Sequence, residues 1–140
     1  MRVYKLMRAN VVSVSETSSA MEAARLLCRH DIGALPVVGE DGRLRGILTD
    51  RDIIIRCVAA ERDPAETPVS ALMTRNVVTV PADADVREAA SLMSANKVRR
   101  LPVTKNGALV GMLSIGDIAR ARSCDMEAAL ALAEISEPAE

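Results

Sequence analysis

Two short segments carry hydroxyl and carboxylate residues at a spacing that would let them bind a ligand. They read Gly46-Ile47-Leu48-Thr49-Asp50-Arg51-Asp52 and Gly111-Met112-Leu113-Ser114-Ile115-Gly116-Asp117. In each, a hydroxyl precedes an aspartate by three residues, where a predicted strand leads into a helix. Such an aspartate can accept hydrogen bonds from both hydroxyls of a ribose, and the helix start beside it favours phosphate. The same spacing also forms a capping box that satisfies backbone N–H groups. For Thr49 and Ser114 the two interpretations are compatible.

The elements around these segments occur twice in the chain. Leu6-Met7 returns as Leu72-Met73, Asn10–Val14 as Asn76–Val80, and Leu35-Pro36-Val37 as Leu101-Pro102-Val103. With one residue deleted in the second turn, the Thr49 and Ser114 segments also align. Self-similarity at a fixed period indicates duplication of one structural unit.

Each copy predicts the order strand, helix, strand, strand, helix. The first copy has a strand over Val11–Val14, a helix capped by Ser19, and a hairpin turn at Glu40-Asp41-Gly42. The second copy turns at Asn106-Gly107, a pair that favours a type I′ turn. One such sheet is too small to bury both faces, so we expect an α/β (α+β) fold in which two βαββα repeats pack sheet to sheet.

The predicted boundaries follow from this pattern. Repeat 1 spans residues 1–60, a polar linker 61–68, repeat 2 69–122, and a C-terminal helix and tail 123–140. The helix covers Met126–Ile135 and has no partner in copy one. It could pack on its own pair, join a dimer or dock a partner.

Composition argues against several function classes. The chain has 140 residues, 49% of them hydrophobic but only 1% aromatic, and its net charge is −1. Neither nucleic acid nor an anionic membrane is favoured by that charge. Three separated cysteines and one histidine, His30, do not supply a structural zinc site. We expect reduced, mostly buried thiols, a cytoplasmic location and no membrane span. With neither a nucleophile–base pair nor a phosphate-binding lysine loop, we expect no enzyme activity.

The order, spacing and duplication of these motifs resemble a tandem pair of CBS domains, a Bateman module. The resemblance covers about Leu6 to Arg122, so the chain looks like a stand-alone bacterial CBS-pair protein. It implies no required cofactor, but a regulatory adenosine-containing ligand such as AMP, ADP, ATP, NAD or S-adenosylmethionine. It also implies a flat homodimer and an effector protein that the sequence does not identify.

In this family the ligand occupies clefts between the two domains, each using residues from both. Carried onto this chain, cleft one combines Thr49 and Asp52 with Val78, Thr79, Lys97, Val98, Arg99 and Arg100. Cleft two combines Ser114 and Asp117 with Val12, Ser13, Asp31, Ile32, Gly33 and Ala34.

The two clefts differ in charge. Cleft one has three cations near the expected phosphates, although Arg99 and Arg100 could also be a solvated pair. Alternation along a strand allows at most one of these two to point into a given cleft. Cleft two has no cation at the matching positions, so we expect it to be empty, weak, or suited to a neutral or cationic nucleoside. The leading hypothesis is a regulatory adenine-nucleotide sensor, and the alternative is a dimerisation scaffold that binds no ligand.

Overall fold

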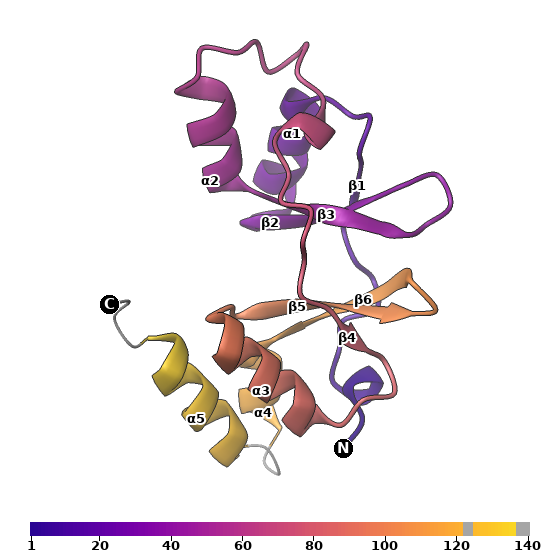
Figure 1. Cartoon of the computed structure of the whole chain (residues 1–140), viewed down its shortest axis with the longest axis vertical. Coiled ribbons are helices and arrows are strands. Elements are labelled where there is room, and N and C mark those ends of the chain that lie inside the picture. Colours follow the sequence, from indigo (N-terminus) through magenta and orange to yellow (C-terminus); the bar gives the residue numbers. More distant parts are fainter. Residues whose placement is uncertain (122–124, 137–140) are drawn as a thin grey trace. The chain divides into compact units, whose positions relative to one another are not determined.

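The computed structural model describes residues 1–121 and 125–136, with side chains up to residue 121 and from 127 to 136. Cys124 and the last four residues of the predicted C-terminal segment, 137–140, lie outside the described residues. The chain divides into two compact units, each with its own three-stranded sheet and core (Figure 1). We call Val12–Val77 the inner unit, and Met1–Val11 together with Val78–Glu140 the terminal unit.

The inner unit contains a sheet of order β1-β2-β3, in which β1 is parallel and β3 antiparallel to β2. Its elements are β1 (Val14–Ser15), α1 (Ala20–His30), β2 (Ala34–Val38), β3 (Leu44–Thr49), α2 (Asp50–Ile53), the π-helical turn η2 (Ile54–Val58) and the 3-10 turn η3 (Val69–Ala71).

The terminal unit repeats this plan with the order β4-β5-β6. Its elements are the 3-10 turn η1 (Val3–Lys5), β4 (Val80–Pro81), α3 (Val86–Asn96), β5 (Arg100–Lys105), β6 (Ala108–Ser114), α4 (Ile115–Arg120) and α5 (Asp125–Ile135). The predicted α/β fold built from two repeats is therefore confirmed. So is the type I′ signal, because Asn106 and Gly107 both have positive φ, 54° and 82°.

The units do not follow the order of the sequence repeats. The N-terminal segment lies in the terminal unit, where Val3 is fully buried, and η3 lies in the inner unit, where Val69 is fully buried. Residues 61–68 also pack on the inner unit, since the N–H of Ala20 donates to the carbonyl of Thr67 at 2.8 Å. Each sheet is thus completed by the segment that precedes the other repeat's first strand.

The repeated glycines Gly46 and Gly111 permit this close packing. Main-chain bonds join Thr74 to Ile47 in the inner unit and Arg8 to Met112 in the terminal unit, at 2.9–3.0 Å. A Cβ at Gly46 would lie 2.5 Å from the carbonyl oxygen of Thr74. A side chain at this position would therefore push away the segment that closes the sheet.

Two sequence predictions differ from the structure. The first strand is shorter than Val11–Val14 because Val14 pairs with Val37, which places Ser13 opposite Pro36, a residue without an N–H to donate. Cys57 is buried as expected, but Cys28 is exposed on the outer face of α1, so the prediction of mostly buried thiols is wrong there.

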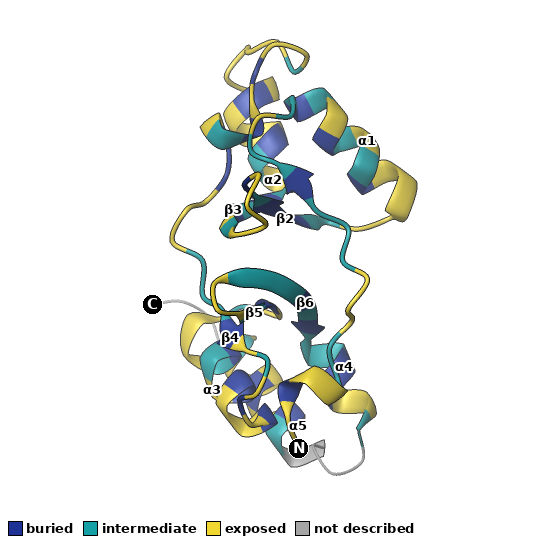
Figure 2. Ribbon diagram, turned by 90° about the vertical axis from the view of Figure 1, so that its right-hand side faces the viewer, coloured by how far each residue is buried: buried dark blue, intermediate teal, exposed yellow. Residues whose placement is uncertain are grey.

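The predicted C-terminal helix is present as α5. It packs on α3 and α4 of its own unit, and Ala128 and Ala131 are buried in the contact. Figure 2 shows the same pattern in the other helices, each with a buried and an exposed face. Across residues 1–121 and 125–136, no helix combines the length and apolar character needed to cross a bilayer.

Candidate functional site

In each unit the motif residues lie together at one end of the strands, which we call the sheet edge. In the inner unit, Ala34 pairs with Thr49, and the N–H of Asp50 donates to the carbonyl of Gly33 at 3.0 Å. Val12 and Ser13 lead into β1, which runs parallel to β2, so they approach the same edge. The strand starts and the start of α2 therefore meet in one place.

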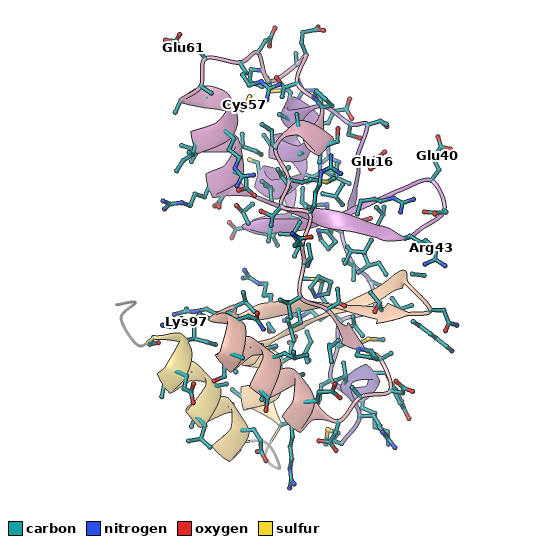
Figure 3. All side chains as sticks on the ribbon, viewed as in Figure 1. Glu16, Glu40, Arg43, Cys57, Glu61 and Lys97 are labelled. Carbon is teal, nitrogen blue, oxygen red and sulfur yellow. The ribbon has the colours of Figure 1, made fainter. Side chains whose placement is uncertain are left out.

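The terminal unit has the same arrangement. Arg100 pairs with Ser114, and the N–H of Ile115 donates to the carbonyl of Arg99 at 2.8 Å. Val78 and Thr79 lead into β4, while Lys97 ends α3 in the left-handed region with φ 53° (labelled in Figure 3), and Val98 follows it. Within each unit, the fold thus joins residues that the sequence analysis had assigned to different clefts.

Both hydroxyl–aspartate motifs form capping boxes. The N–H of Thr49 donates to Oδ2 of Asp52 at 2.9 Å, and the N–H of Asp52 donates to Oγ1 of Thr49 at 3.1 Å. The pair Ser114–Asp117 makes the same two bonds at 2.9 and 3.0 Å. The structural interpretation of the motif is therefore confirmed. It occupies only one oxygen of each carboxylate, so a second role for the other oxygen is compatible with it.

The second carboxylate oxygens differ between the units. Oδ1 of Asp52 has Arg56 Nε at 3.9 Å, beyond hydrogen-bond distance, and the side chain is 15% exposed. Oδ1 of Asp117 accepts from Arg120 and lies 3.5 Å from Arg8 Nε, and its side chain is 6% exposed. Asp52 can accept a further hydrogen bond, whereas Asp117 is already held by two guanidinium groups.

The edges also differ in charge. The terminal unit presents Arg99 and Arg100, both exposed, and neither has an acidic partner among the residues that the structure describes. The inner unit has Gly33 and Ala34 at the matching positions, where a Cβ on Gly33 would lie 3.6 Å from Oδ2 of Asp50. The charge at the sheet edge of the terminal unit thus favours an anionic phosphate, whereas the sheet edge of the inner unit disfavours it.

Sequence reasoning missed the two arginines that hold Asp117. Arg8 falls where the other copy has Thr74, and Arg120 falls where it has Ile55, so both interrupt the repeat. The sequence signal that could have identified these arginines is that each cation is present in only one copy.

No group of three or more histidine, cysteine or acidic residues within the described part of the chain could hold a metal ion.

These features define a duplicated α/β protein with one hydroxyl–aspartate motif at the sheet edge of each unit. The family model of the CBS domain matches residues 3–58 and 69–123, and the chain belongs to the CBS domain family, as the sequence predicted.

Known proteins of similar sequence or structure agree with this assignment. The chain is 40% identical over 130 residues to the CBS domain-containing protein YhcV of Bacillus subtilis, covering 93% of this chain and 91% of that one. It resembles the CBS domain protein PAE2072 from Pyrobaculum aerophilum, solved in complex with AMP, at TM-score 0.79 and 31% identity, covering 92% and 98% of the two chains. It also resembles Hypoxic Response Protein I, solved with two coordinated zinc ions, at TM-score 0.79 and 40% identity, covering 86% and 98%. Family membership supports a regulatory, nucleotide-binding module in general.

Proposed function

We propose that this protein is a regulatory module that binds an adenine nucleotide between its two CBS repeats and is not an enzyme. The ligand's ribose hydroxyls bind Asp52 beside Thr49, and its phosphate binds the cations Lys97, Arg99 and Arg100. Ser114 and Asp117 serve a second, weaker cleft with Val12, Ser13, Ile32, Gly33 and Ala34. The predicted sheet-to-sheet packing belongs to this proposal, and the cytoplasmic location remains a prediction.

The difference between the two aspartates carries the proposal. A ribose diol needs an acceptor oxygen, and Oδ1 of Asp52 offers one, whereas Oδ1 of Asp117 already accepts from Arg120. Phosphate needs cations, and those at the start of β5 have no matching cations in copy one, where Asp31, Gly33 and Ala34 stand. The AMP bound to PAE2072 supports the class of ligand.

Signalling would follow from a shift in population. A ligand that contacts both repeats favours the arrangement in which both contacts form, and this preference can change a surface read by an effector protein. The size of the change depends only on the difference in ligand affinity between the two arrangements.

The test is AMP binding by calorimetry and thermal unfolding, beside Asp52→Ala and Asp117→Ala. Ligand at one hundred times its dissociation constant stabilises the folded protein by about 2.7 kcal/mol, which raises Tm by roughly 8 °C in a chain of this size. We expect this rise in the wild type and in Asp117→Ala, and its loss in Asp52→Ala. If AMP, ADP, ATP and NAD all fail to raise the wild-type Tm, the sensor proposal is wrong.

The alternative, a dimerisation scaffold, has an observation of its own. Ile54, Ile55 and Val58 expose 60%, 49% and 59% of their surface along η2, and Leu130 exposes 62% on α5. Neighbouring exposed aliphatic residues are typical of protein–protein contact sites. We propose that these residues bury themselves in a homodimer, which serves as the scaffold if no ligand binds and as the signalling unit if one does.

A further inference from the structure

Because the chain is duplicated, the two units can be compared with each other. They differ at the end of each sheet opposite the hydroxyl–aspartate motif, where the β2–β3 and β5–β6 hairpins turn. In the inner unit this place is filled by the side chain of Arg45. Its Nη2 lies 3.0 Å from Oδ2 of Asp41, and its Nε lies 3.9 Å from Oε1 of Glu16. The guanidinium lies across Gly39, where a Cβ would be 2.7 Å from Nε. Figure 3 labels Glu16 and, on the hairpin, Arg43.

The terminal unit lacks all three members of this ion network. Arg45 is replaced by Val110, Glu16 by Ala82 and Asp41 by Asn106. A guanidinium and two carboxylates are thus exchanged for two small apolar side chains and one amide.

A cavity of about 720 Å³ occupies this place in the terminal unit. It lies between η1 and the β5–β6 hairpin, and its lining includes Tyr4, Met7, Ala82, Lys105, Asn106 and Val110. The N–H of Tyr4 donates to the carbonyl of Ala82 at 2.9 Å, which fixes η1 as one wall. A volume of this size is typical of small-molecule sites.

The lining indicates the chemistry of the occupant. Met7, Ala82 and Val110 are half-buried and form an apolar floor. Tyr4, the only aromatic residue of the chain, is 50% exposed at the side and offers a ring face. An apolar and preferably flat molecular body would cover these surfaces.

Charge at the rim adds a second requirement. Lys105 is exposed at the hairpin and has no acidic partner within residues 1–121 and 125–136. Asp83 is the one carboxylate of the lining, and Arg2 lies beside it, donating from Nη1 to its main-chain carbonyl at 2.7 Å. The lining itself carries one cation and one carboxylate, so an anion is favoured at the Lys105 end of the rim.

We propose that the terminal unit binds a small aromatic acid in this cavity, with the ring against Tyr4 and the carboxylate or sulfonate at Lys105. The site is separate from the proposed nucleotide site. Arg100 begins β5 and Lys105 ends it, so the two ends lie roughly 17 Å apart at the usual rise of a strand.

The experiment uses 8-anilinonaphthalene-1-sulfonate as the probe, titrated into the full chain. The chain has one tyrosine and no tryptophan, so its intrinsic fluorescence reports on Tyr4 alone. We expect saturable binding of one probe per chain and protection of Tyr4 from quenching by acrylamide. If saturating probe leaves the acrylamide quenching of Tyr4 unchanged, the proposal is wrong, whether or not any variant folds.

The matched variant restores the ion network of the inner unit with Ala82→Glu, Asn106→Asp and Val110→Arg together. The three side chains are those of the equivalent positions in copy one. Because Lys105 stands where copy one has Gly39, circular dichroism first checks that the variant folds. We expect it to bind the probe at least tenfold more weakly, whereas Leu132→Ser, which removes an exposed apolar side chain of α5 outside the cavity lining, leaves the affinity unchanged. Equal affinity in a folded triple variant would place the probe outside the cavity and overturn the proposal.

Lys105→Gln tests the anionic part. We expect about a tenfold loss for the sulfonate and little change for the neutral N-phenyl-1-naphthylamine, because only the sulfonate pairs with the ammonium. Equal losses for both probes would refute the assignment of an acid. The rise in Tm with AMP is measured on the same variants, so failure here is distinguishable from failure of the nucleotide site.

Discussion

Replacing Gly46 by alanine should destabilise the protein more than the same change at Gly111. The two glycines occupy equivalent positions, but their surroundings differ. A Cβ at Gly46 would lie 2.5 Å from the main-chain oxygen of Thr74, which is fixed by hydrogen bonds to Ile47. A Cβ at Gly111 would lie 2.5 Å from the sulfur of Met7, a flexible side chain, and 3.0 Å from the main-chain oxygen of Arg8.

The magnitudes follow from these distances. Overpacking of a fitted contact costs about 1–3 kcal/mol, and alanine recovers about 0.5 kcal/mol through its lower chain entropy in the unfolded state. We therefore expect a loss of about 2 kcal/mol for Gly46→Ala, where main chain must move, and of about 1 kcal/mol for Gly111→Ala. Unfolding in urea, followed by circular dichroism, measures both changes.

A double-mutant cycle makes the prediction sharper. Met7→Ala removes the sulfur that a Cβ at Gly111 would meet, so Met7→Ala and Gly111→Ala together should cost less than the sum of the single changes. Met73→Ala should not rescue Gly46→Ala in this way, because the oxygen of Thr74 stays in place. Equal rescue in both units, or a Gly46→Ala protein as stable as the wild type, would refute the account of how these segments close the sheets.

Three further predictions concern the site, the pH dependence and the assembly. Arg99→Gln and Arg100→Gln should differ about tenfold in their effect on AMP affinity, because neighbouring strand residues face opposite sides; equal effects in calorimetry would contradict this. The pKa of Asp85 is lowered from its ordinary value of 3.8, chiefly because its carboxylate accepts the main-chain N–H of Arg87. Its contribution to stability is thus complete above the ordinary pKa and is lost as the pH falls through the lowered one, so Asp85→Asn should flatten the loss of stability below about pH 4, as urea midpoints will show. Ile54→Glu should turn a dimer into a monomer in sedimentation equilibrium, and a wild type that is already monomeric would end the dimer proposal.

Much of the fold could be predicted because local signals and the repeat agree. Asn106-Gly107 specified its turn, and Ser19 accepts the N–H of Glu22 as the helix-start pattern indicated. The hydroxyl–aspartate spacing correctly predicted the capping boxes at Thr49 and Ser114. Each of these depends on residues within a few positions of one another, which sequence spacing captures.

The exchange of segments between units could not be predicted in the same way. Val3 and Val69 are apolar residues in short turns, and nothing in their spacing says which sheet they cover. Their placement depends on main-chain pairing across 27 residues for Ile47 with Thr74 and across 104 residues for Arg8 with Met112, which is a property of the folded chain. Burial of Asp117 between two arginines follows from that placement, because Arg8 reaches it only when the N-terminal segment joins the terminal unit.

The duplication lets each copy serve as a control for the other. Where both copies keep a residue, as with Gly46 and Gly111, the structure gives a shared reason in packing. Where they differ, one copy often fills with its own side chains what the other leaves open. Arg8 and Arg120 hold Oδ1 of Asp117, whereas Oδ1 of Asp52 has Arg56 only at 3.9 Å. Arg45 lies at the hairpin end of the inner unit, whereas the terminal unit has a cavity there. Each unit thus has one open position and one that its own side chains fill, so the differences between the copies, rather than the residues they share, mark the positions where a ligand can bind.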